Sequence, residues 1–89
     1  MKVIKINSLW CPACLIMNNL LDKVKDKYAL DIIDYDYDED HEKIKIYNIG
    51  KILPVIIFLD NNNKEIKRII GELKIKELTK ILDNLERGF

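Results

Sequence analysis

The spacing of apolar residues changes along the chain, and each spacing predicts a different kind of secondary structure. From Pro12 to about Lys27, apolar side chains recur every three to four positions, which is typical of a helix with one buried face. Apolar residues alternate with aspartates over Leu30–Tyr37, which predicts a strand. Val55–Leu59 is apolar at every position, which suits a central strand covered on both faces. The remaining expected elements are strands at Lys2–Ile6 and Ile66–Ile70 and helices at about Glu39–Asn48 and Lys74–Glu86.

The order of these elements, βαβαββα, predicts an α/β fold. Alternating strands and helices favour a parallel pair of strands, and the polar turn Asp60–Asn63 favours an antiparallel hairpin between the last two strands. The chain has 89 residues with no linker or repeat, so we expect one domain over residues 1–89. A chain of this length can bury one modest core.

Charge and hydropathy exclude several classes of protein. Fifteen basic residues balance fifteen acidic ones, which argues against nucleic-acid binding through bulk charge. The longest apolar run, Leu53–Leu59, is far too short to span a bilayer. Lys2 and Lys5 interrupt the first apolar stretch, so no signal-peptide core is predicted. We therefore expect a cytoplasmic monomer that contacts neither nucleic acid nor membrane.

The two cysteines carry the most informative chemistry. Cys11 and Cys14 lie where the first strand passes into the first helix, and Pro12 suits the first helical position. Unpaired N–H groups and the positive end of the helix dipole favour the thiolate of Cys11. Cys14 follows one turn later, within reach for a disulfide. We predict that Cys11 attacks a substrate disulfide and that Cys14 resolves the mixed disulfide.

Three other interpretations of the cysteine pair stay open. The cysteines could be two small buried apolar residues, or they could hold a cluster shared between two subunits. They could also be half of a zinc site, but only His41 is available as a further ligand. The acidic run Asp34–Glu42 begins with the spacing of a calcium loop, yet Glu39 and Lys45 stand where that loop needs Gly and Glu. We expect no metal and no cofactor beyond the redox-active disulfide, and we expect Asp38 to cap the second helix.

Three segments together resemble a known family. They are the WCPAC stretch Trp10–Cys14, the Leu53-Pro54 pair that opens the third strand, and the segment Lys64–Gly71 that leads into the last helix. The chain is similar to the thioredoxin superfamily in its short, glutaredoxin-sized form, and the match covers nearly the whole chain. The resemblance implies a thioredoxin-like, four-stranded mixed sheet in the order 2-1-3-4, with the last strand antiparallel, flanked by three helices. We expect no counterpart of the additional N-terminal strand and helix of full thioredoxins.

The resemblance also implies which residues contact a substrate. Pro54 matches the family proline that has a cis peptide bond and packs against the cysteines, and Gly71 matches a glycine that lies near them. The residue before the proline presents its backbone to a substrate strand. We therefore expect Trp10, Pro12, Ile52 and Leu53 to form an apolar rim around Cys11, and we expect substrate contacts from this rim and from Pro54 and Gly71.

One departure from the family concerns a pair of charges. Thioredoxins keep a buried aspartate six residues before the first cysteine and a lysine opposite it on the neighbouring strand. Here Lys5 and Asp34 occupy these places, so the charges are exchanged. If the two residues meet beneath Cys14, Asp34 would accept its proton, and Lys5 would keep Asp34 ionised and favour the thiolate. The alternative is that both are solvated surface charges.

For function, the resemblance implies a thiol–disulfide oxidoreductase that reduces protein disulfides. Its partners would be disulfide-bearing substrate proteins and an electron donor, either a reductase of the thioredoxin reductase type or glutathione. The Cys-Pro-x-Cys motif and the chain length favour a glutaredoxin, whereas Ile52-Leu53-Pro54 and Gly71-Glu72 depart from the glutaredoxin patterns at those places. A binding module whose dithiol does not turn over is the non-enzymatic alternative.

Overall fold

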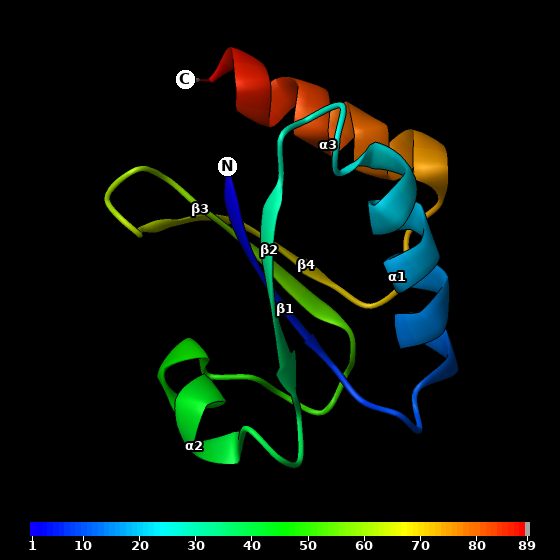
Figure 1. Ribbon diagram of the computed structural model, residues 1–89, viewed down its shortest axis with the longest axis vertical. Coiled ribbons are helices and arrows are strands. Elements are labelled where there is room, and N and C mark those ends of the chain that lie inside the picture. Colours follow the sequence, from blue (N-terminus) through cyan, green and yellow to red (C-terminus); the bar gives the residue numbers. More distant parts are fainter. Residues whose placement is uncertain (89) are drawn as a thin grey trace.

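The computed structural model describes residues 1–88. A four-stranded mixed sheet forms the centre of the molecule (Figure 1). Its strand order is β2-β1-β3-β4, as predicted. β1 is parallel to β2 and antiparallel to β3, and β4 is antiparallel to β3. The sequence pattern left the antiparallel pairing of β1 with β3 unspecified. The strands are β1 (Lys2–Asn7), β2 (Asp31–Asp36), β3 (Val55–Leu59) and β4 (Glu65–Ile70).

The helices cover both faces of the sheet. α1 (Pro12–Val24) and α3 (Ile75–Arg87) lie on one side, and α2 (His41–Ile44) lies on the other (Figure 1). Because successive side chains of a strand point to opposite faces, β3 supplies Ile56 and Phe58 to the core beneath α1 and α3 and Val55, Ile57 and Leu59 to the core beneath α2. All five residues of β3 are buried, as its continuous apolar run predicts. Within residues 1–88, no helix has the length and apolar character needed to cross a membrane.

The second helix is much shorter than predicted. Helical structure begins at His41 rather than at about Glu39, and a short 3-10 helix, η1 (Lys45–Tyr47), replaces its second half. The cause is a turn closed by Asp36, whose carboxylate oxygen Oδ2 accepts hydrogen bonds from the backbone N–H groups of Asp38 and Glu39 at 3.0 and 2.8 Å. An aspartate that accepts the backbone N–H groups of the residues after it in this way competes with the helix for those donors.

Candidate active site

The two cysteines differ sharply in their exposure at the start of α1. Cys11 occupies the N-cap position in an extended conformation, and its sulfur Sγ accepts the backbone N–H of Cys14 at 3.1 Å. Pro12 takes the first helical position, where a missing N–H costs nothing. Both thiols are free, Cys11 is partly exposed, and Cys14 is only 1% exposed. The Cys11 sulfur is therefore accessible to another molecule, whereas the buried Cys14 thiol is accessible through Cys11.

The environment of Cys14 keeps this residue protonated at neutral pH. Burial raises the pKa of Cys14 to about 11, and the hydrogen bond and the charge interaction with Cys11 act in the same direction. Hydrogen bonding to the backbone of Ser8 and the positive charge of Lys5 lower the pKa, but by less.

The raised pKa of Cys14 predicts a loss of stability in alkali. As pH rises from about 9, the ordinary value, to about 11, the thiol ionises in the unfolded chain before it does so in the native protein. Ionisation then favours the unfolded state, so the free energy of unfolding of the reduced protein falls across this window. Urea unfolding at a series of pH values measures this fall in the free energy of unfolding, with Cys14→Ala as the control. An equal fall in Cys14→Ala would show that ionisation of Cys14 is not its cause.

Pro54 and Gly71 lie side by side, Pro54 directly before β3 and Gly71 directly after β4. The Leu53–Pro54 peptide bond is cis, and the Pro54 carbonyl accepts the Gly71 N–H at 2.8 Å. Gly71 has φ of 86°, which a residue with a Cβ rarely adopts, and a Cβ there would lie 3.6 Å from Cγ2 of Ile52. Leu53 belongs to the buried cluster that contains Cys14 and against which Cys11 packs.

One of the four residues predicted to form the apolar rim, Leu53, does not have an exposed side chain. The Leu53 side chain is a core residue on the α2 side of the sheet and is not part of the rim. Its contribution to a substrate would have to come from its backbone. The side chains of Trp10, Pro12 and Ile52 are exposed, as the prediction requires. Their substrate contacts stay a prediction.

Trp10 is held in place by Asp38, which was predicted to cap the second helix. Its indole Nε1–H donates to Oδ2 of Asp38 at 3.0 Å, and its ring packs edge-on against Tyr37 with ring centroids 6.4 Å apart. Trp10 is nevertheless 61% exposed, so one face stays open beside Cys11. The prediction that Asp38 caps the second helix is wrong, because the helix begins later and Asp40 is its N-cap residue. The parallel pairing of β1 and β2 brings the loop after β1, which contains Trp10, next to the loop after β2, which contains Asp38.

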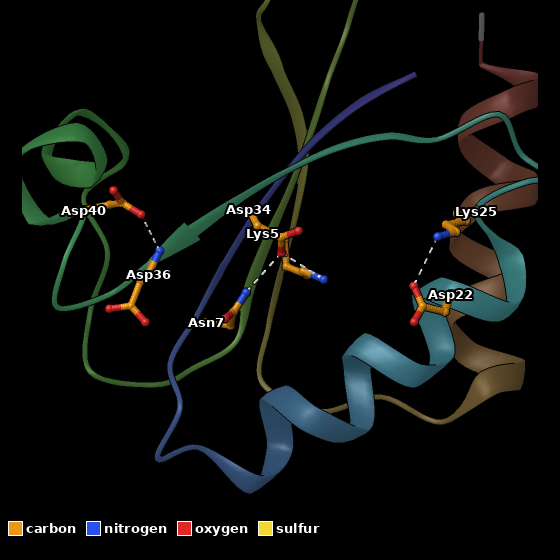
Figure 2. Close-up of polar contacts among 7 residues, drawn as sticks. All are labelled: Lys5, Asn7, Asp22, Lys25, Asp34, Asp36 and Asp40. Atoms are coloured by element: carbon orange, nitrogen blue, oxygen red, sulfur yellow. Dashed lines mark hydrogen bonds and ion pairs between the residues drawn. The ribbon is translucent and has the colours of Figure 1, made fainter.

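Lys5 and Asp34 form the predicted contact. They are direct partners in the parallel pairing of β1 with β2, and Nζ of Lys5 lies 2.9 Å from Oδ1 of Asp34 (Figure 2). The same oxygen accepts the side-chain amide of Asn7 at 3.2 Å. The Lys5 side chain is 9% exposed and that of Asp34 is 60% exposed. Lys5 is therefore no surface charge, and its positive charge acts on Cys14. Whether the pair takes part in proton transfer stays a prediction.

Within the described residues 1–88, no group of three or more His, Cys, Asp or Glu side chains is placed to hold a metal ion. The chemistry that the site can perform with its own residues is thiol–disulfide exchange. One partly exposed thiol at a helix N-terminus and one buried thiol a turn further along are the arrangement that this exchange needs.

Comparison with solved structures finds proteins of similar fold. Similar structures include thioredoxin 1 from Thermosipho africanus TCF52B, with 24% identity over 98% of this chain and 92% of that chain and a TM-score of 0.79. The reduced thioredoxin pre-protein of Schistosoma mansoni has 22% identity over 93% of this chain and 76% of that chain, also at a TM-score of 0.79. Mitochondrial thioredoxin 3 from Saccharomyces cerevisiae has 24% identity with the same coverage and TM-score. At these identities the likeness shows the fold.

Sequence comparison supplies the family. No curated protein matches the chain. The profile of the thioredoxin family, described as "Thioredoxin", matches residues 1–84, which include both cysteines, Pro54 and Gly71. Because this match spans nearly the whole chain, and because the fold and the cysteine geometry agree with it, the chain belongs to the thioredoxin family.

Proposed function

We propose that the protein reduces disulfide bonds of other proteins through the dithiol of Cys11 and Cys14. The Cys11 thiolate attacks one sulfur of the substrate disulfide, forms a mixed disulfide with it and releases the other substrate sulfur as a thiolate, which takes up a proton. Cys14 then loses its proton and attacks Cys11. The Cys11–Cys14 bond forms, the bond to the substrate breaks, and the second substrate sulfur leaves as a thiol. Two electrons pass from the dithiol to the substrate.

The observation that carries this proposal is the difference in exposure between the two thiols at the start of α1. Cys11 is partly exposed with its sulfur among the N–H groups that begin α1, and Cys14 is buried with its pKa raised to about 11. A pair of structural cysteines would need no such asymmetry. The exposed face of Trp10 and the backbone around Pro54 and Gly71 offer a surface on which a peptide could lie next to Cys11.

The ion pair of Lys5 with Asp34 supports the second step in this proposal. The buried ammonium of Lys5 lowers the pKa of Cys14 and so favours the thiolate that must form there. Asp34 keeps the ammonium paired, and it is the proton acceptor that the sequence suggests. The effect of Lys5 on the pKa of Cys14 can be separated from proton acceptance by Asp34, because only the first requires Lys5 to be charged.

Two assays run side by side test the proposed function and identify the electron donor. In the first, the protein reduces insulin with thioredoxin reductase and NADPH. In the second, it reduces hydroxyethyl disulfide with glutathione. We expect activity in the first assay. Activity in the second alone would assign the glutaredoxin reaction, for which the Cys-Pro-x-Cys motif is the supporting feature. Activity in neither, with the dithiol intact, would point to a binding module.

A further inference from the structure

Strand β2 is an edge strand of the sheet. Within residues 1–88, it is paired with β1 alone, as the strand order shows (Figure 1). The backbone N–H of Asp31 donates to the Met1 carbonyl at 2.8 Å. Just beyond the other end of the strand, the N–H of Tyr37 donates to the Asn7 carbonyl, also at 2.8 Å. Because the backbone groups of successive strand residues point to opposite sides, the odd-numbered residues of β2 face β1 and the even-numbered residues face away from the sheet.

The outward-facing backbone groups of β2 are closed off at its ends and open in its middle. At the end of the strand, the Asp36 N–H donates to Oδ2 of Asp40 at 2.8 Å (Figure 2), and the Asp36 carbonyl accepts the Asp40 N–H at 3.0 Å. Before the strand, the Leu30 N–H is hydrogen-bonded within the preceding turn. Between these ends, the N–H and C=O groups of Ile32 and Asp34 have no partner within residues 1–88. Such open groups at a sheet edge are a template for pairing with another chain.

These open groups are complementary to those of a second copy of the same strand. When two copies of β2 run antiparallel about a two-fold axis at Ile33, Ile32 of each copy lies opposite Asp34 of the other. Each of these two pairs exchanges two hydrogen bonds, so four hydrogen bonds use all the open groups of both copies. Moving the axis by one residue in either direction leaves some open groups without a partner, because the Leu30 N–H and the Asp36 backbone groups are already bonded.

The charges along β2 are compatible with this pairing. Like charges directly opposite each other would destabilise a strand pair. With the axis at Ile33, Asp31 of one copy lies opposite Tyr35 of the other. Asp34 lies opposite an isoleucine, and the ammonium of Lys5 already balances its charge at 2.9 Å. No aspartate of the strand therefore lies directly opposite an aspartate.

The surroundings of the edge favour a second copy as the partner. Residues 36–42, which follow β2, are strongly acidic, and residues 22–30, which precede it, carry three lysines and two aspartates. Antiparallel pairing brings the acidic segment of each copy to the lysine-bearing segment of the other, so opposite charges approach at both ends. On the α2 side, Ile33 and Tyr35 line a groove of about 350 Å³ together with Ile46, which is 76% exposed. The two-fold axis places the grooves of both copies on the same face, side by side.

We propose that the protein forms a symmetric dimer in which the β2 strands of two copies pair antiparallel about Ile33. The two four-stranded sheets then join into one continuous sheet. The interface is small, so the dissociation constant should be on the order of 100 µM, as for transient complexes. The dimer departs from the monomer expected from the sequence, because an open strand edge is a property of the fold. It does not depend on the proposed function, since neither Cys11 nor Cys14 belongs to this edge.

Amide hydrogen exchange of the full-length wild-type protein tests the pairing without any substitution. NMR follows exchange at about 20 µM and about 1 mM, in a reducing agent that prevents disulfides between copies. The amides of Ile32 and Asp34 should exchange about threefold more slowly at the higher concentration, because pairing protects them. The amides of Ile33 and Tyr35 are the internal control, since they are bonded to β1 at both concentrations. Equal exchange of Ile32 and Asp34 at both concentrations would overturn the proposal, as would slowing confined to β4.

A charge exchange at the two-fold axis tests the register. Ile33→Lys and Ile33→Glu each place like charges opposite each other, so each variant alone should dimerise at least about tenfold more weakly than the wild type. An equimolar mixture of the two variants should regain the dimer, because lysine then faces glutamate. Ile70→Glu, at a 58% exposed position of the opposite edge strand β4, is the matched control and should dimerise like the wild type. Sedimentation equilibrium measures all of these proteins.

The outcomes decide the proposal independently of disulfide reduction. A wild-type protein that sediments as a monomer at about 1 mM overturns it, and so does a mixture of folded Ile33→Lys and Ile33→Glu that does not regain the dimer. Undiminished dimerisation of either variant alone places the axis elsewhere and also overturns it. Urea unfolding establishes that both variants are folded, and where one is not, hydrogen exchange of the wild type decides. Neither test measures disulfide reduction, so their failure leaves the proposed function standing.

Discussion

Cys11→Ser should abolish disulfide reduction, and Cys14→Ser should stop the reaction at the mixed disulfide. Cys11 is the partly exposed thiol at the start of α1, so without it no bond to the substrate forms. Without Cys14, the bond forms but no second thiol lies within reach to break it. Turnover in the insulin assay should be lost in both variants, whereas only Cys14→Ser should accumulate a covalent complex with the substrate.

Alkylation of the reduced wild-type protein provides an independent measurement of the same assignment. Near neutral pH, iodoacetamide should modify Cys11 and spare Cys14, because Cys14 is buried and its pKa is raised to about 11. Peptide mass spectrometry identifies the modified residue. First reaction at Cys14 would reverse the two roles, and equal reaction at both would remove the basis of the proposed mechanism.

The second large effect that we expect concerns the ion pair of Lys5 with Asp34. Removing the charge of Asp34 should lower the free energy of unfolding more than removing the charge of Lys5. Asp34→Asn leaves the buried ammonium of Lys5 without its counter-ion and should lower the free energy of unfolding by about 2 kcal/mol, somewhat less than the loss of a partner in a fully buried pair. Lys5→Met removes the buried charge and leaves Asp34 largely in solvent. It should change stability by less than about 1 kcal/mol.

The chain contains a matched control for this comparison. Asp22 and Lys25 form an exposed pair on α1, with Nζ and Oδ1 3.5 Å apart (Figure 2). Because both groups stay hydrated, Asp22→Asn should cost no more than about 0.5 kcal/mol. Urea unfolding measures all three variants. Equal costs for Asp34→Asn and Asp22→Asn would show that burial of Lys5 does not matter.

Thiol titration of Lys5→Met adds a functional measurement. The positive charge of Lys5 lowers the pKa of Cys14, so its removal should raise that pKa further above its ordinary value. Resolution of the mixed disulfide should slow as a consequence, while its formation by Cys11 proceeds. An unchanged titration of Cys14 would leave Lys5 with a structural role alone.

The sequence by itself determined the order of the elements and the position of the two cysteines at the start of the first helix. These are local properties: the helical spacing after Pro12, the continuous apolar run Val55–Leu59 and the Cys11–Cys14 spacing each depend on neighbouring residues. The match of Lys5 with Asp34 came from the resemblance to the thioredoxin family, and the register of the parallel pair β1–β2 confirms it. The second helix was the weakest part of the prediction, since the Asp36 turn competes with helical hydrogen bonds there.

Tertiary structure alone decided what surrounds those thiols. The contact of Asp38 with Trp10 joins residues 28 positions apart, and it exists because the parallel pairing of β1 and β2 brings their following loops to the same edge of the sheet. Whether Leu53 lies at the rim or in the core depends on packing between layers. Burial depends on the whole chain, and it sets the proton chemistry of Cys14.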